Sequence, residues 1–182
     1  MHIPVLLKEV LEFLNPKLGE NFVDCTFGFG GHSKVILEKI KPNGKVLGIE
    51  WDNEKLKVQS AKCKVINDSY ANLKEIIKRE KFGKVNGILL DLGISSWEVE
   101  NSGRGFSFQK DELLDMRFSQ SQSLTAKEII NQWSEEELVK IFSEYGQERF
   151  AKNIARNVVG IRYQQQIETT FQLVDIIRKS FP

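Results

Sequence analysis

The sequence predicts an α/β fold with a parallel sheet in its N-terminal part, followed by a mostly helical part. Short apolar runs alternate with helical patterns as far as about residue 92. The stretch Phe22–Ser33 passes from an apolar run through three glycines into a helical pattern. Glu50 ends the next apolar run, about twenty residues later, where an acid of a nucleotide-binding βαβ unit holds a ribose.

The elements of the sheet follow from periodicity and turn residues. A proline near its start and apolar residues three and four apart predict a short amphipathic helix over residues 4–14. Strands are predicted over residues 21–25, 45–50, 64–67 and 85–92, and helices over residues 32–40, 53–61 and 71–80. Near-continuous apolar strands separated by helices are typical of a parallel sheet covered on both faces. Ligands then bind beyond the strand ends, where Asp24, Glu50, Asp68 and Asp91 would lie.

After Asp91 the pattern changes to an ordered loop with glycine and serine beside aromatic residues, which extends to Phe108. From Leu124 onward the pattern is helical and no further strand is predicted. Capping boxes are predicted at Thr125–Glu128 and Ser134–Glu137, and helices over residues 137–145, 148–159 and from Thr169 or Thr170 to Ser180. We therefore predict a Rossmann-like domain over residues 1–98 and a mostly helical domain over residues 99–182.

The composition limits the classes of function. The chain has 182 residues, of which 41% are hydrophobic and 28% charged, with a formal net charge of +1. This charge gives no global attraction to nucleic acid, so a basic site must be local. Cys25 and Cys63 are too few and too isolated for a disulfide framework or a metal site, and no metal is expected. The sequence has no apolar run of membrane-spanning length and no leader pattern at its start, so we expect a cytoplasmic protein without a membrane partner.

The glycine loop is open to more than one interpretation. Gly28, Gly30 and Gly31 can form an ordinary tight turn, and Asp24 can brace that turn instead of contacting a ligand. His32, at the start of the helix, is expected to position other groups rather than to act as a general base. A dinucleotide oxidoreductase is disfavoured, because its loop needs the spacing GxGxxG and here the third glycine directly follows the second.

Several longer motifs carry a resemblance to a known family. They are HIPVLL (residues 2–7), DCTFGFGGHS (24–33), GIEWD (48–52), GILLDLGISS (87–96), RGFSF (104–108), LDMR (114–117) and YGQERFAKNIAR (145–156). In these motifs the chain resembles the bacterial small-subunit rRNA methyltransferase H family (MraW-type) over essentially its whole length. The resemblance implies N4-methylation of a cytidine in the decoding region of 16S rRNA, with S-adenosyl-L-methionine as cofactor and the small ribosomal subunit as partner. It also implies a class I methyltransferase sheet, interrupted after its fourth strand by a helical substrate-recognition domain.

The resemblance implies a set of cofactor-binding residues. Gly30, Gly31 and His32 match the loop around the methionine part of the cofactor, and Glu50 stands where the family usually has Asp. Tyr70 matches an aromatic position against the adenine, and Asp91 matches the acid after the fourth strand. Glu98 falls where a cofactor-contacting Gln is common, although Trp97–Glu98 departs from the usual Pro-Gln. The whole predicted set is Asp24, Gly28, Gly30, Gly31, His32, Glu50, Tyr70, Asp91 and Glu98.

Catalytic and RNA-binding residues are predicted in the same way. Asp91, Ser95 and Ser96 are expected to accept hydrogen bonds from the reacting amino group, unless Asp91 only satisfies local N–H groups. The predicted RNA-binding residues are Arg104, Phe106, Phe108, Arg149, Lys152 and Arg156. The aromatic residues, with Trp97, can stack a base or anchor their loop to the core. The three last-named cations form one helical stripe, which can bind phosphates or be a solvated helix face.

Members of the family continue past the position of Pro182 with the last strands of the sheet and a Ser-Phe-His-Ser-type motif. The sheet is therefore expected to lack its C-terminal strands. The alternative function is a catalytically incomplete fragment that binds cofactor or RNA and needs the missing segment or a partner chain. An unpaired edge at the fourth strand predicts a homodimer or a complementing polypeptide at that edge.

Overall fold

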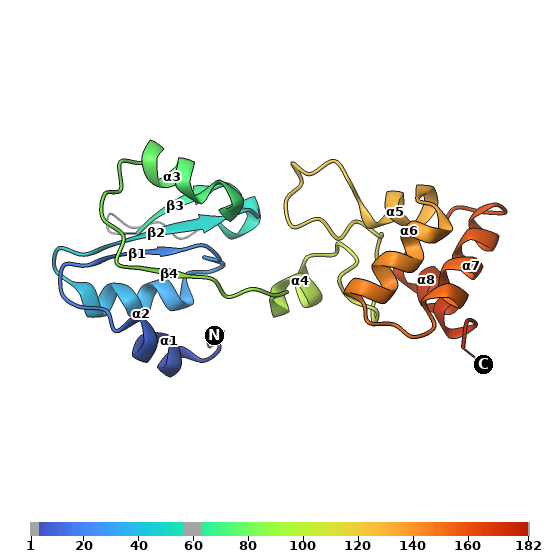
Figure 1. Ribbon diagram of the computed structural model, residues 1–182, viewed down its shortest axis with the longest axis horizontal. Helices are drawn as coiled ribbons and strands as arrows, with labels where there is room; N and C mark the ends of the chain where they lie inside the picture. The colour runs from blue at the N-terminus through green and yellow to red at the C-terminus, as the bar shows by residue number, and fades with distance from the viewer. Residues whose placement is uncertain (1–3, 57–62, 182) are drawn as a thin grey trace. The chain divides into compact units, whose positions relative to one another are not determined.

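The computed structural model describes residues 4–56 and 63–181, and the chain divides into two compact units (Figure 1). The units are Met1–Gly93 and Ile94–Pro182, and each is described by itself. The division precedes helix α4 (Ser96–Asn101), whereas the sequence analysis placed the domain boundary within this helix.

The first unit is built on a four-stranded parallel sheet. Its strands are β1 (Asn21–Asp24), β2 (Lys45–Glu50), β3 (Cys63–Asn67) and β4 (Gly87–Leu89), in the order β3-β2-β1-β4. This order and direction are those of the first four strands of a doubly wound Rossmann sheet, which confirms the predicted fold class. In the register, Val23 of the central β1 lies opposite Leu47 of β2 and Ile88 of β4.

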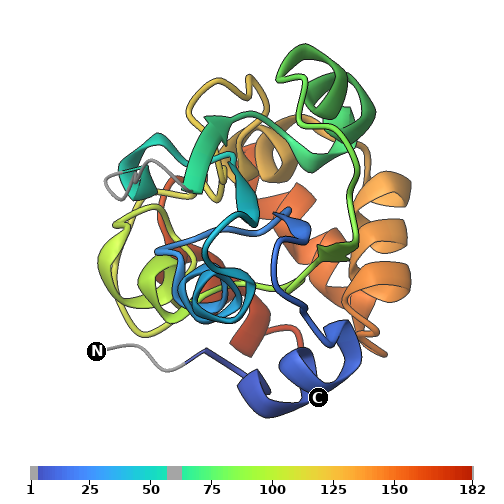
Figure 2. The ribbon, with the colours of Figure 1, turned by 90° about the vertical axis from the view of Figure 1, so that its left-hand side faces the viewer.

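Helices cover the two faces of this sheet, as Figures 1 and 2 show. Helices α1 (Leu7–Leu14) and α2 (Gly31–Ile40) pack on the face that carries Phe22, and α3 (Leu73–Arg79) packs on the face that carries Val23. Successive residues of β1 point to opposite faces, so Phe22 and Val23 belong to two separate apolar clusters. Both faces are buried, which explains why the strands are nearly continuous apolar runs.

Three predicted elements differ in length from the observed ones. The fourth strand was predicted over residues 85–92, but only Gly87–Leu89 pair, and Leu90 and Leu92 are exposed. A strand needs a partner for its backbone groups, and beyond Leu89 the described residues offer none in the sheet. The helix predicted over residues 53–61 begins as a 3₁₀ turn, η1 (Asn53–Lys55), and its residues 57–61 lie outside the described residues. The helix predicted over residues 71–80 is divided into a 3₁₀ turn, η2 (Tyr70–Asn72), and α3.

The described residues of the second unit form helices, a long loop over residues 102–125 and an isolated β-bridge between Leu113 and Thr169. After α4 come α5 (Ala126–Gln132), α6 (Glu135–Lys140), a π-helical turn η3 (Ile141–Tyr145), α7 (Ala151–Arg162) and α8 (Thr170–Arg178) (Figure 1). Their shared core contains Leu114, Leu138, Ala155 and Ile176. The predicted capping boxes at α5 and α6 are confirmed. In each box the hydroxyl of the first residue accepts a hydrogen bond from the backbone N–H of the glutamate, and the glutamate carboxylate accepts one from the backbone N–H of the first residue.

Candidate functional site

The glycine loop joins β1 to α2 at the carboxyl edge of the sheet. Gly28 has a φ of 54° and Gly30 a φ of 76°, in the left-handed region that side chains disfavour. A Cβ added to Gly28 would meet no atom closer than the Thr26 carbonyl oxygen at 3.9 Å, so the space above it is open. A Cβ on Gly30 would lie 2.7 Å from the Phe27 ring. The loop therefore presents bare backbone at Gly28, which a ligand can approach closely, whereas the Phe27 ring fills the space at Gly30.

Glu50, the last residue of β2, is fixed against this loop. Its Oε2 accepts a hydrogen bond from the Gly28 N–H at 2.7 Å, and its Oε1 accepts one from the Asp52 N–H at 2.9 Å. The side chain is partly buried, and each carboxylate oxygen still has a lone pair for another donor. The sequence prediction that the glycines and Glu50 form one site is therefore supported by a direct contact. A carboxylate held in this way can accept hydrogen bonds from two neighbouring hydroxyl groups.

Asp24 braces the glycine loop from its buried side. Its side chain is buried, and its two oxygens accept hydrogen bonds from the Thr26 N–H at 3.2 Å and the Ser33 hydroxyl at 2.7 Å. Burial raises the pKa of this carboxyl, and the two hydrogen bonds lower it in part. The structure thus gives Asp24 the bracing role that the sequence analysis left open beside cofactor contact. Ser33 and Thr26 were not predicted, although a hydroxyl in the first turn of the helix was a visible signal.

His32 and Asp91 lie together beside the loop. His32 Nε2 is 2.9 Å from the Val5 carbonyl oxygen, and because a carbonyl only accepts, this nitrogen carries the proton. In the neutral ring Nδ1 is then an acceptor, and it lies 4.0 Å from Asp91 Oδ2. The Asp91 N–H donates to the Thr26 hydroxyl at 2.8 Å, which ties the end of β4 to the glycine loop. The Val5 carbonyl thus holds the His32 ring, whose role as a positioning group stays a prediction, and the Asp91 side chain is 44% exposed.

Tyr70 follows β3 at the same edge of the sheet. Asn67 pairs with Glu50 in the sheet, and the Asp68 N–H donates to the Glu50 carbonyl at 3.2 Å. Ser69 caps η2, so that Tyr70 begins the turn with 47% of its surface exposed. The structure thereby brings the predicted residues of the first unit to one edge.

The remaining predicted cofactor and catalytic residues belong to the second unit. Glu98 is fully buried, and its carboxylate accepts hydrogen bonds from the Ser95 N–H and from the Ser95 hydroxyl in a capping box. The start of α4 therefore depends on a bond between a predicted catalytic residue and a predicted cofactor-binding residue. Ser96, the first residue of α4, is exposed.

Arg104 differs from its predicted role in RNA binding. The side chain is buried, and its guanidinium donates to the carbonyls of Arg117 at 2.9 Å and Phe118 at 3.1 Å. It also lies over the Trp97 ring, 5.4 Å from the centroid. A guanidinium taken out of water needs hydrogen-bond partners, and the two carbonyls supply them. Arg104 therefore joins its own loop segment to the one that carries Arg117 and Phe118. An RNA phosphate cannot replace these partners without opening the loop.

The two phenylalanines of the same loop have different surroundings. The Phe106 ring packs on Phe118 at a centroid distance of 5.4 Å, which is the anchoring role left open in the sequence analysis. Phe108 is 73% exposed. Lys152 and Arg156 of the stripe are exposed on α7, whose opposite face is buried, and Arg149 is exposed in the turn two residues before α7.

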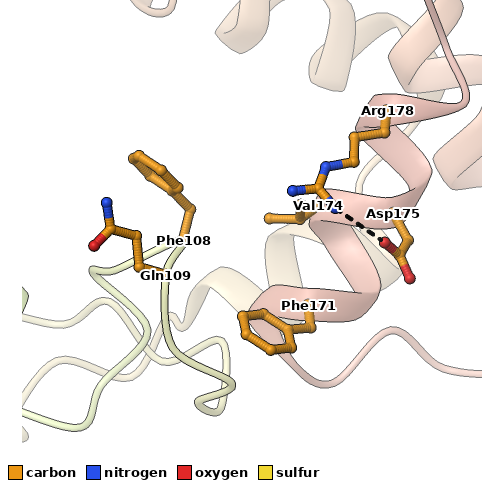
Figure 3. A pocket seen from close by; sticks show the side chains of 6 residues that line it. All are labelled: Phe108, Gln109, Phe171, Val174, Asp175 and Arg178. Carbon is orange, nitrogen blue, oxygen red and sulfur yellow. Dashed lines mark ion pairs between the residues drawn. The ribbon is translucent and has the colours of Figure 1, made fainter.

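The structure adds residues that the sequence analysis missed. A cavity of about 410 Å³, the aromatic pocket, is lined by Phe108, Gln109, Phe171, Val174, Asp175 and Arg178 (Figure 3). The last four are at positions i, i+3, i+4 and i+7 of α8, so a helical wheel places them on one face. The sequence carries no signal that brings Phe108 beside them.

Two features are absent from the described residues, 4–56 and 63–181. In these residues no helix is both long enough and apolar enough to cross a membrane. They also contain no group of three or more His, Cys, Asp and Glu side chains that could hold a metal ion. Cys25 and Cys63 are buried and form no disulfide, and burial raises the pKa of each thiol to about 11.

Comparison with known proteins identifies relatives along the whole chain. Ribosomal RNA small subunit methyltransferase H of Clostridium botulinum (strain Kyoto / Type A2) is 42% identical over 187 aligned residues, which cover 100% of this chain and 60% of that protein. The protein of the same name from Caldicellulosiruptor saccharolyticus is 43% identical and is covered to 61%. The chain thus spans about 60% of the length of these curated relatives.

A crystal structure of a candidate rRNA methylase from Clostridium thermocellum aligns with a TM-score of 0.39 and 18% identity, over 53% of this chain and 58% of that one. A likeness this weak carries no argument about fold or function. The sequence profile of the MraW methylase family, in contrast, matches residues 1–182. The chain therefore belongs to the MraW methylase family.

Proposed function

We propose that this chain acts in the cytoplasm as a methyltransferase that uses S-adenosyl-L-methionine to methylate N4 of a cytidine in the decoding region of 16S rRNA. Family membership supports the reaction class. The observation that carries the proposal is the Glu50 carboxylate, held 2.7 Å from the Gly28 N–H at the carboxyl edge of a Rossmann-like sheet.

The types of residue at this edge suit the ribose, adenine and methionine parts of the cofactor. Glu50 would accept the two ribose hydroxyls, and the exposed ring of Tyr70 would lie against the adenine. The backbone from Gly28 to Gly31 would hold the methionine part, and the open space at Gly28 would allow its close approach to the main chain. The cofactor, when bound, supplies a methyl group activated by a positively charged sulfur.

Asp91 is the proposed catalytic group of the first unit. The amino group of cytosine is a weak nucleophile because its lone pair is delocalised into the ring. A carboxylate that accepts a hydrogen bond from this amino group raises its electron density and can receive the proton released after the N–C bond forms. The bond from the Asp91 N–H to the Thr26 hydroxyl holds the backbone that carries this carboxylate beside the glycine loop. Ser95 and Ser96 are proposed as further acceptors near the same amino group.

For the RNA, we propose the stripe of Arg149, Lys152 and Arg156 as a phosphate-binding surface and Phe108 as a base-stacking residue. All four side chains are exposed; Lys152 and Arg156 lie on one face of α7, and Arg149 lies in the turn two residues before its start. Arg104 and Phe106 would contribute by holding the loop that carries Phe108. The substrate is then 16S rRNA, free or in the small ribosomal subunit.

A second candidate is a chain that binds cofactor and RNA but needs a further polypeptide for catalysis. The β4 edge favours it, because Ile88 is 44% exposed and Leu90 is 48% exposed beside a sheet that has no described strand beyond β4. Exposed apolar edges recruit partners, either a second copy or a complementing polypeptide.

Calorimetric titration of the purified chain with S-adenosylhomocysteine tests the proposal. We expect saturable binding that Glu50→Ala weakens about tenfold or more, because it removes the acceptor of two charge-assisted hydrogen bonds. Glu75→Ala, which removes an exposed glutamate on α3, is the matched control and should bind like the unaltered chain. Absence of binding by a chain that circular dichroism shows to be folded would favour the second candidate.

A further inference from the structure

The aromatic pocket of the second unit has a built, rigid frame. Thr170, at the start of α8, donates its hydroxyl hydrogen to the Lys110 carbonyl at 2.5 Å and its N–H to the Glu112 carbonyl at 2.9 Å. The Glu112 N–H donates in return to the Thr170 hydroxyl at 3.1 Å. These bonds join the loop that carries Phe108 to the helix that carries Phe171, so the backbone segments that carry the two rings are held together before any ligand arrives.

The pocket offers flat apolar faces beside a cation. Phe108 is 73% exposed and Phe171 is 44% exposed, and in Figure 3 the two rings lie on opposite sides of the opening. Arg178 is paired with Asp175 at 3.9 Å, and both side chains are largely exposed, at 76% and 65%. A long, solvated ion pair of this kind contributes little free energy, so the guanidinium can leave Asp175 for a phosphate with only a small loss of free energy.

This combination has the chemistry of a nucleotide. Aromatic rings stack on a base of any kind, a guanidinium pairs with a phosphate, and the Gln109 amide can both donate to and accept from a base edge. We infer that the aromatic pocket binds one unstacked nucleotide of the RNA substrate, with its base on Phe108 and Phe171 and its phosphate on Arg178. The inference rests on the proposed RNA substrate and adds a second contact region to the cationic stripe on α7.

Fluorescence anisotropy with a short, unstructured, labelled RNA tests the inference on the full chain. Phe108→Ala and Phe171→Ala should each raise the Kd about tenfold without changing the slope of log Kd against log salt, because stacking releases no counterions. Arg178→Gln should instead reduce that slope by about 0.7. Tyr145→Ala removes a ring that is 79% exposed in the same unit but outside the pocket, and should leave both quantities unchanged.

A second RNA separates stacking from misfolding. With an oligonucleotide whose bases are replaced by abasic residues, the unaltered chain and Phe171→Ala should bind equally, because the lost contact requires a base. A Phe171→Ala chain that stays tenfold weaker on abasic RNA would overturn the assignment. RNA binding by both phenylalanine variants within twofold of the unaltered chain would also overturn it, while leaving the proposed RNA substrate intact. Failure of the folded, unaltered chain to bind any RNA would overturn both.

Discussion

Asp24 illustrates how a single buried carboxylate can organise a loop. Its oxygens are shared between the Thr26 N–H and the Ser33 hydroxyl, at the two ends of the glycine turn. Burial favours the neutral form and the two donors favour the charged form, and the net result is a raised pKa. The conformation of the loop, and with it the contact between Gly28 and Glu50, depends on this balance.

We predict that Ser33→Ala destabilises the chain by roughly 1–3 kcal/mol at pH 7, because a buried carboxylate loses a donor. The pKa of Asp24 in the folded state lies above its unfolded value of 3.8, and the substitution should raise it further. The stability tied to the protonated form is fully present below pH 3.8 and is lost as the pH rises through the folded pKa. The deficit of the variant should therefore be smallest in acid and grow with pH.

Urea unfolding over a series of pH values measures this deficit. The control is Ser33→Ala in an Asp24→Asn background, where the deficit should not depend on pH because the titrating group is gone. An equal deficit at every pH in the Asp24 background would show that the hydroxyl does not act through the carboxylate.

The helices of the second unit show which local patterns are sufficient to start a helix. Thr125, Ser134 and Thr169 each cap a helix through a reciprocal box with a Glu or Gln three residues later. The first two boxes were predicted from spacing alone, because capping is a bond between near neighbours. The segment 137–145 was predicted as one helix but changes to a π-helical turn at Ile141. The Gly146 N–H bonds to the Ile141 carbonyl, and the Glu148 N–H bonds to the Phe142 carbonyl.

The stripe on α7 gives a prediction about salt. Replacing Arg149, Lys152 and Arg156 together by Gln should lower the slope of log Kd for RNA against log salt by about 2, because each phosphate contact contributes about 0.7. The three side chains are exposed, two on α7 and one in the turn before it, so helix content and melting temperature should stay close to those of the unaltered chain.

The matched control carries the same loss of charge in the first unit. Lys74, Lys78 and Lys81 are exposed on and just after α3, and their replacement by Gln also removes three positive charges. If this control changed the slope as much as the α7 variant, the effect would be one of net charge, and the stripe would not be a binding surface.

The chain as a whole consists of two units with separate cores. Phe22 and Val23 anchor the two faces of the sheet, and Leu138 lies at the centre of the helical unit. The sheet is covered on both faces at β1 and β2, but Ile88 remains 44% exposed on the face that α3 covers elsewhere. The β4 edge is therefore the part of the sheet least protected from association.

We predict that the unaltered chain self-associates at micromolar concentration and that Ile88→Lys with Leu90→Lys shifts it toward monomer. Lysine side chains on an edge strand repel a second edge and resist desolvation. Light scattering coupled to size exclusion measures the shift. Leu18→Lys, at a side chain that is 75% exposed away from the sheet edge, should leave the association unchanged. A monodisperse monomer for the unaltered chain would contradict the prediction.

Much of the first unit and the centre of its site could be predicted without coordinates. Strand and helix periods gave the order of the elements, and the spacing between the glycines and Glu50 predicted one joint site, which the bond from the Gly28 N–H supports. The length of the fourth strand was wrong, because pairing depends on a neighbouring strand and not on the apolar run itself. The burial of Arg104 and Glu98 was also missed, since charged residues are rarely buried unless partners are provided.

What the sequence determined by itself were features set by near neighbours: the helix starts, the glycine turn, and the alternation of strand and helix. Only the tertiary structure decided that Phe106 packs inside while Phe108 faces outward, and that Phe108 meets Phe171 across the aromatic pocket. The bond from the Thr170 hydroxyl to the Lys110 carbonyl joins residues 60 positions apart. Periodicity acts over a few residues, whereas such a contact depends on how whole elements pack, and packing is a property of the complete folded unit.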